Sequence, residues 1–229
     1  MPPKKEKGKK RKELPTAFLP DTPETRAELA QYYQSTSRVD QGLGRLMEIL
    51  KKNGKRENTL IFFTSDHGMA LAGGKTTVYE GGLRVPMIVR WTGKIKPNTV
   101  TEEPFAHWDV LPTLLSAARV SKPREIDGVS FLPTLLGREQ LKKHDFLYWE
   151  MHEYGSQQAA RKGDWKVIRP APGKALELYN LKRDPTESQN VASLNPEVVT
   201  DFENFLRTAR TRSVLWPITQ PKETAASRR

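Results

Sequence analysis

Apolar residues recur every three to four positions between Asp21 and Gly54, which is the spacing of an amphipathic helix. Thr22 and Pro23 form a helix start, and Asn53 with Gly54 forms a stop. The apolar positions are Leu29, Tyr32, Tyr33, Val39, Leu43, Leu46, Met47 and Leu50. We therefore expect one long helix that packs on a sheet, with the Tyr32–Tyr33 pair in its packed face.

A short unbroken apolar run, Leu60–Phe63, follows this helix. Such a run predicts a central strand that is covered on both faces. Asp66 and His67 come directly after it, where ligands bind in open α/β sheets. A carboxylate beside an imidazole can bind a divalent cation, so Asp66 and His67 are candidate metal ligands. Two ligands do not complete a site, and the others must come from elsewhere.

Lys75 lies seven residues past Gly68, between glycines and threonines, and suits an anionic group. Glu80-Gly81-Gly82 then allows a tight turn before a second apolar strand, Met87–Trp91. The segment also resembles a phosphate-binding P-loop. However, five residues rather than four separate Gly68 from the glycine before Lys75, and we expect no helix through Glu80-Gly81-Gly82. We therefore reject nucleotide binding.

A helix is predicted from about His107 to Ala118. His107 could be a further metal ligand, but a lone histidine at a helix start is more often a surface or capping residue. Asp109 is expected to tie the helix start to a neighbouring loop.

From about Lys142 the pattern changes to short strands separated by turns. The strand candidates are Phe146–Met151, Gln158–Lys162, Trp165–Arg169 and Ala175–Tyr179, and Gly163-Asp164 is a hairpin signal. Asn195-Pro196 begins a last amphipathic helix. We expect a small antiparallel sheet covered by one helix. His152 lies between the first two strands and is a candidate substrate-binding residue, with a plain loop as the alternative.

The charge of +11 is unevenly distributed, because residues 1–12 carry seven Lys or Arg against one Glu. This low-complexity segment is expected to be disordered. It could bind nucleic acid, but no aromatic residue interleaves its lysines for base stacking, and we expect a solvated tail. No apolar run is long enough to predict a membrane span, and the basic N-terminus lacks the apolar segment of a signal peptide. The absence of cysteine excludes disulfides and thiolate metal sites.

Several ordered motifs point to one family. They are the SDHG motif that ends at Gly68, GK followed by EGG and RVP, Asp109–Leu115, Asp127–Gly137 and Glu177–Ala192. Together they resemble the type I sulfatases of the alkaline-phosphatase superfamily, from about Leu19 to Pro217. The resemblance implies an α/β fold: the C-terminal portion of an alkaline-phosphatase-like sandwich, with a mostly parallel sheet and helices, followed by a small antiparallel sheet with one helix. The expected segments are a disordered basic tail (1–17), the C-terminal part of the catalytic domain (18–140), a small α+β subdomain (141–217) and a disordered tail (218–229).

The resemblance also implies an activity, the hydrolysis of sulfate esters with one bound calcium. Asp66 and His67 then resemble the family's metal ligands, and Lys75 resembles the side chain that holds the sulfate and the leaving oxygen. The substrate would be an aryl sulfate, a sulfated glycan or a sulfamate, and the sequence does not discriminate among them.

Two expected parts of such an enzyme are not found in the sequence. The family's nucleophile is a formylglycine made within C/S-x-P-x-R; this chain has no cysteine, and its nearest match, Ser121–Arg124, has the arginine one place too early. The family's early aspartate pair has no counterpart either. We therefore expect a C-terminal sulfatase segment that is inactive by itself, binds calcium weakly and could pair with a separate N-terminal half. The alternatives are a phosphatase or phosphodiesterase of the same superfamily, or a non-catalytic basic protein that binds nucleic acid.

Overall fold

The computed structural model describes residues 21–71, 73–123, 125–153 and 155–218. Apart from Ile218, the tails expected to be disordered lie outside the described residues. The helices are α1 (Pro23–Lys52), α2 (Glu80–Leu83), α3 (Val110–Ala118), α4 (Leu132–Leu135) and α5 (Pro196–Leu206), with short 3₁₀ turns at Arg56–Asn58, His107–Asp109 and Ala192–Leu194. The strands are β1 (Ile61–Thr64), β2 (Met87–Arg90), β3 (Leu147–Met151), β4 (Gln157–Lys162), β5 (Trp165–Arg169) and β6 (Glu177–Asn180). No helix in the described part of the chain combines the length and the apolar character that a membrane crossing requires.

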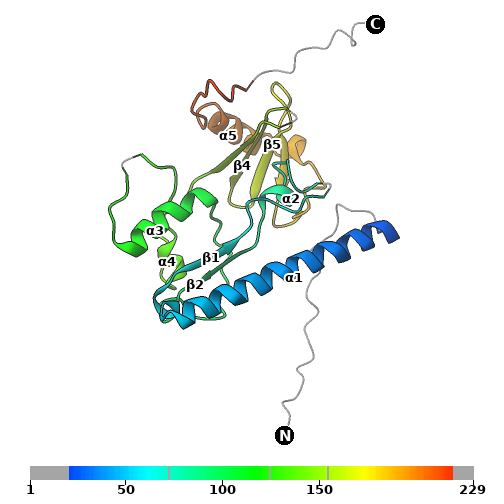
Figure 1. The fold of residues 1–229 in the computed structure, drawn as a ribbon. Coiled ribbons are helices and arrows are strands. Elements are labelled where there is room, and N and C mark those ends of the chain that lie inside the picture. Colours follow the sequence, from blue (N-terminus) through cyan, green and yellow to red (C-terminus); the bar gives the residue numbers. More distant parts are fainter. Residues whose placement is uncertain (1–20, 72, 124, 154, 219–229) are drawn as a thin grey trace.

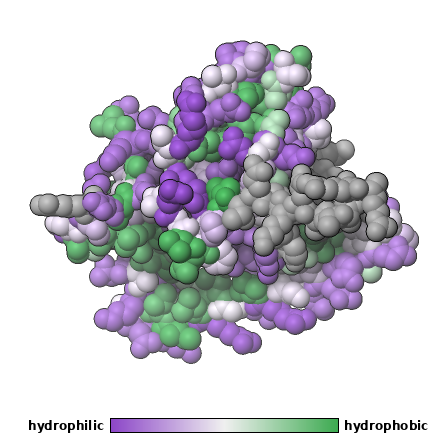
Figure 2. Space-filling view, turned by 90° about the horizontal axis from the view of Figure 1, so that it is seen from above, coloured by the Kyte–Doolittle hydropathy of each residue, from purple (hydrophilic) through white to green (hydrophobic). Residues whose placement is uncertain are grey.

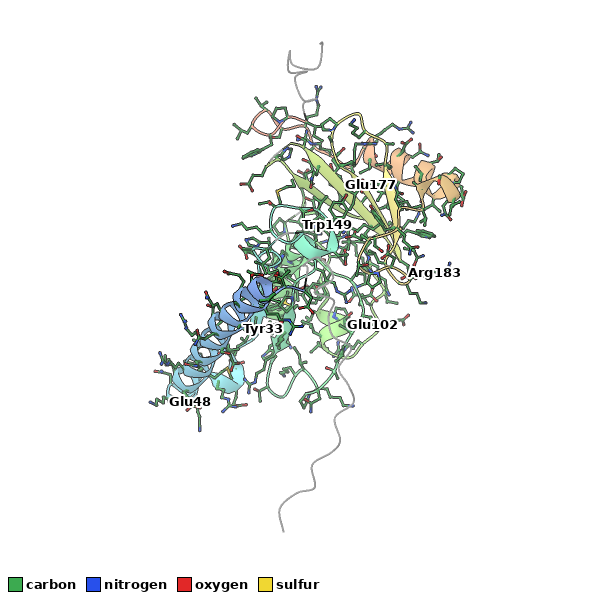
Figure 3. All side chains as sticks on the ribbon, turned by 90° about the vertical axis from the view of Figure 1, so that its right-hand side faces the viewer. Tyr33, Glu48, Glu102, Trp149, Glu177 and Arg183 are labelled. Carbon is green, nitrogen blue, oxygen red and sulfur yellow. The ribbon has the colours of Figure 1, made fainter. Side chains whose placement is uncertain are left out.

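Helix α1 confirms the predicted start and stop. The side chain of Thr22 accepts a hydrogen bond from the Thr25 amide at 3.2 Å, and Asn53 caps the other end. However, no residue of α1 is buried, and Tyr33 is 58% exposed. The predicted core packing of the Tyr32–Tyr33 pair is therefore wrong, because both side chains are largely exposed among the described residues. Figure 3 shows Tyr33 and Glu48 along α1 and Trp149 on β3.

Strands β1 and β2 form a two-stranded antiparallel ribbon, with Ile61 opposite Arg90 and Thr64 opposite Met87. Figure 1 shows α1 running beneath this ribbon. The described residues thus contain an antiparallel pair and not the mostly parallel sheet that we expected. Strand β1 is half-buried rather than covered on both faces, because β2 is its sole strand partner in the described part of the chain.

Asp109 has the structural role predicted for it. Its carboxylate is almost fully buried and accepts hydrogen bonds from the backbone amides of Ala106 and Val129, both at 2.8 Å. His144 Nε2 lies 2.7 Å from the same carboxylate. One side chain therefore joins the start of α3 to the loop before α4 and to the approach to β3.

The second sheet, hereafter the C-terminal sheet, is antiparallel in the order β3-β4-β5-β6. The hairpin at Gly163 is confirmed, since Lys162 pairs with Trp165 and Gly163 has a φ of 58°. The four predicted strands and the last helix are all present, with ends shifted by a residue or two. This part of the fold follows from local pattern, because each strand pairs with its neighbour in sequence.

Both faces of the C-terminal sheet are covered, and by different parts of the chain. On one face, α5 packs Phe202 and Leu206 against Val167 and Leu178. On the other face, the segment just after Lys75 packs against the sheet. Val78, Tyr79 and Leu83 of this segment form an apolar cluster with residues of the sheet, which are Ala159, Ile168 and Tyr179. The sheet is therefore packed directly against the chain that links the predicted site to β2.

Candidate functional site

The loop after β1 brings Asp66 and His67 together. His67 Nδ1 lies 2.8 Å from the carbonyl oxygen of Gly68, which can only accept a hydrogen bond. In the neutral imidazole the single N–H is therefore at Nδ1, and Nε2 keeps its lone pair. Nε2 is 3.5 Å from Asp66 Oδ2, so two acceptor atoms face one another. This arrangement suits a shared cation, and a backbone partner that fixes the tautomer is typical of metal-binding histidines.

The Asp66 carboxylate is 83% exposed and is ionised near neutral pH. Desolvation acts to raise its pKa, but the charge that His67 carries when protonated, backbone hydrogen bonds and the charge of Lys75 outweigh this and hold the pKa below its usual value. The His67 amide donates one of these bonds, at 3.0 Å. The charge of Lys75 is the smallest of these contributions, and the place of Lys75 beside the Asp66–His67 pair stays a prediction.

These residues fit a metal only in part. Calcium prefers six to eight oxygen ligands, and the loop offers one carboxylate and one imidazole. Across the described residues, no group of three or more His, Cys, Asp and Glu side chains is placed to hold a metal ion. Asp66 and His67 could therefore form one side of a metal site, with the other ligands supplied from outside this part of the chain.

Four glycines hold the loop by direct backbone contact. The Gly68 amide donates to the Gly82 oxygen at 2.8 Å, and a Cβ on Gly68 would lie 1.8 Å from the Gly81 oxygen. A Cβ on Gly82 would lie 2.7 Å from the oxygen of Gly74. Gly68 is next to His67 in the chain, and Gly74 is next to Lys75. Gly82 therefore contacts the residue adjacent to His67 and the residue adjacent to Lys75.

One expectation about this segment is wrong. Glu80–Leu83 forms a single helical turn, α2, although we expected no helix there. Tertiary packing overrides the low helix propensity of the two glycines, since Glu80 and Gly82 are both buried. The turn begins five residues beyond Lys75 and has only four residues, so the argument against a P-loop still holds.

His152 lies in a different cluster. Its Nε2 is 2.9 Å from Glu150 Oε2 and its Nδ1 is 3.4 Å from Ser156 Oγ. Glu150 also accepts from Arg210 Nε at 2.6 Å, and the Trp216 ring lies 5.7 Å from the imidazole. Within the described residues these contacts do not involve the Asp66 loop. Substrate binding by His152 thus remains a prediction.

His107 is exposed at the first position of its 3₁₀ turn, with Nε2 3.4 Å from Thr64 Oγ1 at the end of β1. It therefore lies near the end of β1, two residues before Asp66, and its role as a metal ligand or a surface residue stays a prediction. A cavity of about 320 Å³ lies elsewhere, lined by residues that include Phe105, Phe131, His144 and Arg161. Its lining contains none of the predicted site residues.

Lys166 is a residue of this region that the sequence motifs did not indicate. It is fully buried, and its Nζ lies 2.9 Å from Glu80 Oε1 and 2.8 Å from Glu187 Oε1. The available signal was a lysine next to Val167 and Ile168 within a short strand, because an unpaired charge is costly to bury. The partners could not be identified from sequence, since they lie far away along the chain.

The Glu187 carboxyl in this cluster leads to a pH prediction. Its pKa is raised from 4.5, chiefly by burial, although Lys166 opposes the shift. A group whose pKa is raised in the folded state stabilises the folded protein when the pH is below the pKa of the unfolded state. This contribution is lost as the pH rises through the pKa of the folded state. We expect the free energy of unfolding of the wild type, relative to Glu187→Gln, to fall as pH rises above about 4.5. Urea unfolding at several pH values measures this difference.

Glu150 is the matched control. Desolvation raises the pKa of its carboxyl, but hydrogen bonds from Tyr148, His152 and Arg210 lower it overall. The Glu150 carboxyl therefore contributes stability when the pH is above the pKa of the unfolded state, and this contribution is lost as the pH falls through the pKa of the folded state. The wild type should lose stability relative to Glu150→Gln on acidification, the opposite trend. If the stability differences of the two variants change with pH in the same direction, the opposite pKa shifts of Glu187 and Glu150 are contradicted.

Comparison with known proteins decides the family. A family profile described as Sulfatase matches residues 3–120, and one described as N-sulphoglucosamine sulphohydrolase, C-terminal, matches residues 71–211. The chain belongs to the sulfatase family. The N-acetylgalactosamine-6-O-sulfatase of Bacteroides thetaiotaomicron is 30% identical over 211 residues, which cover 76% of this sulfatase chain and 40% of that protein. The chain spans about two fifths of the length of such curated relatives.

Solved structures share the fold of this sulfatase chain. One, in complex with its substrate D-glucosamine-2-N,6-O-disulfate, gives a TM-score of 0.67 at 27% identity and covers 75% of this chain and 38% of that chain. The phosphonate monoester hydrolase of Agrobacterium radiobacter gives 0.66 at 27% identity, covering 77% of this chain and 40% of that chain. The predicted α/β class, the C-terminal portion of an alkaline-phosphatase-like fold, is confirmed.

Proposed function

We propose that this chain supplies one side of a sulfatase active site, which hydrolyses a sulfate ester carried on an aryl group or a sugar. The observation that carries the proposal is the Asp66–His67 pair just after β1, with Lys75 in the same loop between β1 and α2. A calcium ion, when bound, would polarise the sulfate oxygens. Asp66 would hold that ion through its ionised carboxylate and His67 through Nε2.

Lys75 would act on the sulfate itself. Its side chain is exposed, so its ammonium can reach a bound anion. Charge builds on the leaving oxygen as the ester bond breaks, and a positioned cation stabilises that charge. The backbone of Lys75 is fixed, because its amide donates to the Met69 oxygen at 2.9 Å. We therefore assign Lys75 to sulfate binding and to stabilisation of the leaving oxygen.

The nucleophile would come from an N-terminal segment that bears formylglycine. We infer that this segment packs on the apolar side chains that α1, β2 and α3 leave exposed. These are Tyr33, Val39, Leu46, Ile49, Ile88, Leu111 and Leu114. Hydrophobic residues also form patches on the face shown in Figure 2. Exposed apolar patches of this kind are typical of interaction sites.

The proposal is tested by assaying release of sulfate from an aryl sulfate in calcium. The purified chain is assayed alone, then together with an N-terminal segment whose C-x-P-x-R motif has been converted to formylglycine. That segment is supplied in the same reading frame or as a separate polypeptide, and the combination is called the assembled enzyme below. We expect turnover only from the assembled enzyme. Equal turnover by the chain alone would refute the proposed division of the site.

A second candidate is hydrolysis of a phosphate or phosphonate monoester, which the similarity to the phosphonate monoester hydrolase favours. The same assembled enzyme is therefore offered an aryl phosphonate and an aryl phosphate at matched concentrations. A higher kcat/KM for the sulfate supports the first candidate. A higher value for either phosphorus ester would replace it with the second.

Calcium binding by the chain alone should be weak. With one carboxylate in the loop, we expect a dissociation constant of about 10⁻³ M or weaker. Nuclear magnetic resonance of the His67 ring during calcium titration measures it. Asp66→Asn should abolish the response, whereas Asp40→Asn, an exposed aspartate on α1, should not change it. A response that persists in Asp66→Asn would place calcium elsewhere.

A further inference from the structure

A buried ionic cluster joins the C-terminal sheet to the helical turn α2. Lys166 of β5 is completely inaccessible to solvent, and its Nζ contacts the carboxylates of both Glu80 and Glu187. The second oxygen of Glu187 accepts a hydrogen bond from the backbone amide of Glu80. Glu80 is therefore held through both its side chain and its backbone, by two residues that are distant in sequence.

Further contacts fix the same turn. Tyr79 precedes Glu80, and its hydroxyl donates to Glu177 at 2.5 Å; Tyr179 donates to the same oxygen at 2.9 Å. Val78 is almost fully buried against the C-terminal sheet. Residues 78–80 are thus anchored by apolar packing and by two separate carboxylates. The anchoring elements, β5, β6 and the loop that holds Glu187, contain none of the predicted catalytic or metal-binding residues.

The anchored turn leads directly to the site. Gly81 and Gly82 follow Glu80 and are the residues that Gly68 contacts through its backbone. Gly82 also contacts Gly74, whose oxygen would lie 2.7 Å from a Cβ at Gly82. A displacement of Glu80 would be transmitted to both sides of the loop, because backbone atoms in direct contact cannot move independently.

We propose that Lys166 is a positioning residue for the sulfatase site, which fixes Glu80 and thereby sets the placement of His67 relative to Lys75. The proposal rests on the proposed function for its consequence in catalysis. The geometric part of the proposal, the placement of His67 relative to Lys75, concerns this chain alone and does not depend on the proposed function. Lys166 touches neither substrate nor metal in this account and acts only through Glu80 and Gly82.

Charge and direction explain why a lysine suits this position. An apolar side chain in β5 would leave the Glu80 and Glu187 carboxylates buried without a counter-charge. The ammonium also donates a hydrogen bond to Glu80 at 2.9 Å, and this directional contact defines where Glu80 lies, whereas apolar packing allows the turn to slide. A buried ion pair of this kind is weak evidence for stability, and its best supported use is to specify one arrangement.

The first test compares Lys166→Met with Lys162→Met in the chain alone. Lys162 lies on the neighbouring strand and makes an exposed ion pair with Asp201 at 2.8 Å, so it is a matched substitution at the surface of the same sheet. The readouts are the nitrogen chemical shifts of the His67 ring and hydrogen exchange at the Gly68 amide. We expect Lys166→Met to shift the His67 signals and speed Gly68 exchange, and Lys162→Met to leave both unchanged.

Glu187→Gln keeps the test decisive if Lys166→Met fails to fold. It has nearly the same shape, retains the Lys166–Glu80 pair and keeps an acceptor for the Glu80 amide. We expect it to fold and to move the His67 and Gly68 signals in the same direction by a smaller amount. A folded Lys166→Met or Glu187→Gln variant whose His67 and Gly68 signals match the wild type would overturn the proposal.

The second test uses the assembled enzyme. A 1 Å misplacement of a reacting group can cost about 10²-fold in rate, so we expect kcat to fall by about that factor in Lys166→Met and KM to change little. A loss confined to KM, or one that Lys162→Met reproduces, would overturn positioning. An inactive wild-type assembly would refute the proposed function instead, and the His67 and Gly68 signals of the chain would still decide the role of Lys166.

Discussion

Replacing Lys75 with alanine in the assembled enzyme is expected to lower kcat for an aryl sulfate by a factor of about 10²–10³. The charge of the ammonium is one of the causes that hold the pKa of Asp66 below its usual value. Once it is removed, the charge that develops on the leaving oxygen has no positioned cation among these loop residues. Since that charge appears mainly in the transition state, kcat should fall more than KM rises.

The measurement is steady-state hydrolysis of aryl sulfates whose leaving groups differ in pKa. The loss of kcat in Lys75→Ala, relative to the wild type, should be largest for the poorest leaving group, because the lysine stabilises negative charge on the leaving oxygen. Lys94→Ala removes an exposed lysine from a surface turn and serves as the control, with no expected change. If Lys75→Ala retains wild-type kcat for every leaving group, Lys75 is a surface residue.

Gly68→Ala is expected to disrupt the loop itself. The new Cβ would stand 1.8 Å from the Gly81 oxygen and 2.8 Å from the Gly81 carbonyl carbon, both of which are backbone atoms. No side-chain rotation can relieve this overlap, so the backbone at Gly68 and the α2 turn must separate. We expect the free energy of unfolding to fall by about 1–3 kcal/mol or more, the usual cost of overpacking. In the assembled enzyme we also expect a loss of kcat on the order of 10²-fold.

Gly42→Ala is the matched control for that substitution. Gly42 lies in α1 with nothing within 4 Å of where its Cβ would stand. Alanine there should stabilise the helix by about 0.5–1 kcal/mol, because glycine loses more backbone entropy on folding. Urea unfolding of both variants measures the two effects. Equal stability of Gly68→Ala and the wild type would show that Gly68 and Gly81 are not in contact.

The parts of the fold that were predicted from sequence are those stabilised by near neighbours. The four strands of the C-terminal sheet pair in chain order, and the Gly163 hairpin and the Asn195-Pro196 helix start are local signals. The predictions that were wrong concern surfaces whose partners lie far away. The helical spacing predicts that Tyr33 is packed, yet it is more than half exposed among the described residues.

The candidate site shows the same division. Asp66 and His67 are adjacent in sequence, so their proximity follows from covalent geometry and from the end of β1. The link between Lys75 and this pair came from family resemblance rather than from any local pattern. The backbone contact of Gly82 with Gly68 and Gly74 joins separate elements, and so do the side-chain ion pairs of Lys166. Composition and periodicity do not encode such long-range contacts.

The position of Val78 and Tyr79 against the C-terminal sheet has a consequence for the order of folding. Strands β3 to β6 and α5 close only short loops, so they can assemble quickly, whereas Val78 and Ile168 must meet across a long stretch of chain. We therefore expect the Asp66 loop to reach its final shape late, after the sheet exists as a template. A nascent chain that ends before β5 would carry every predicted metal ligand and Lys75 without the surface that shapes them.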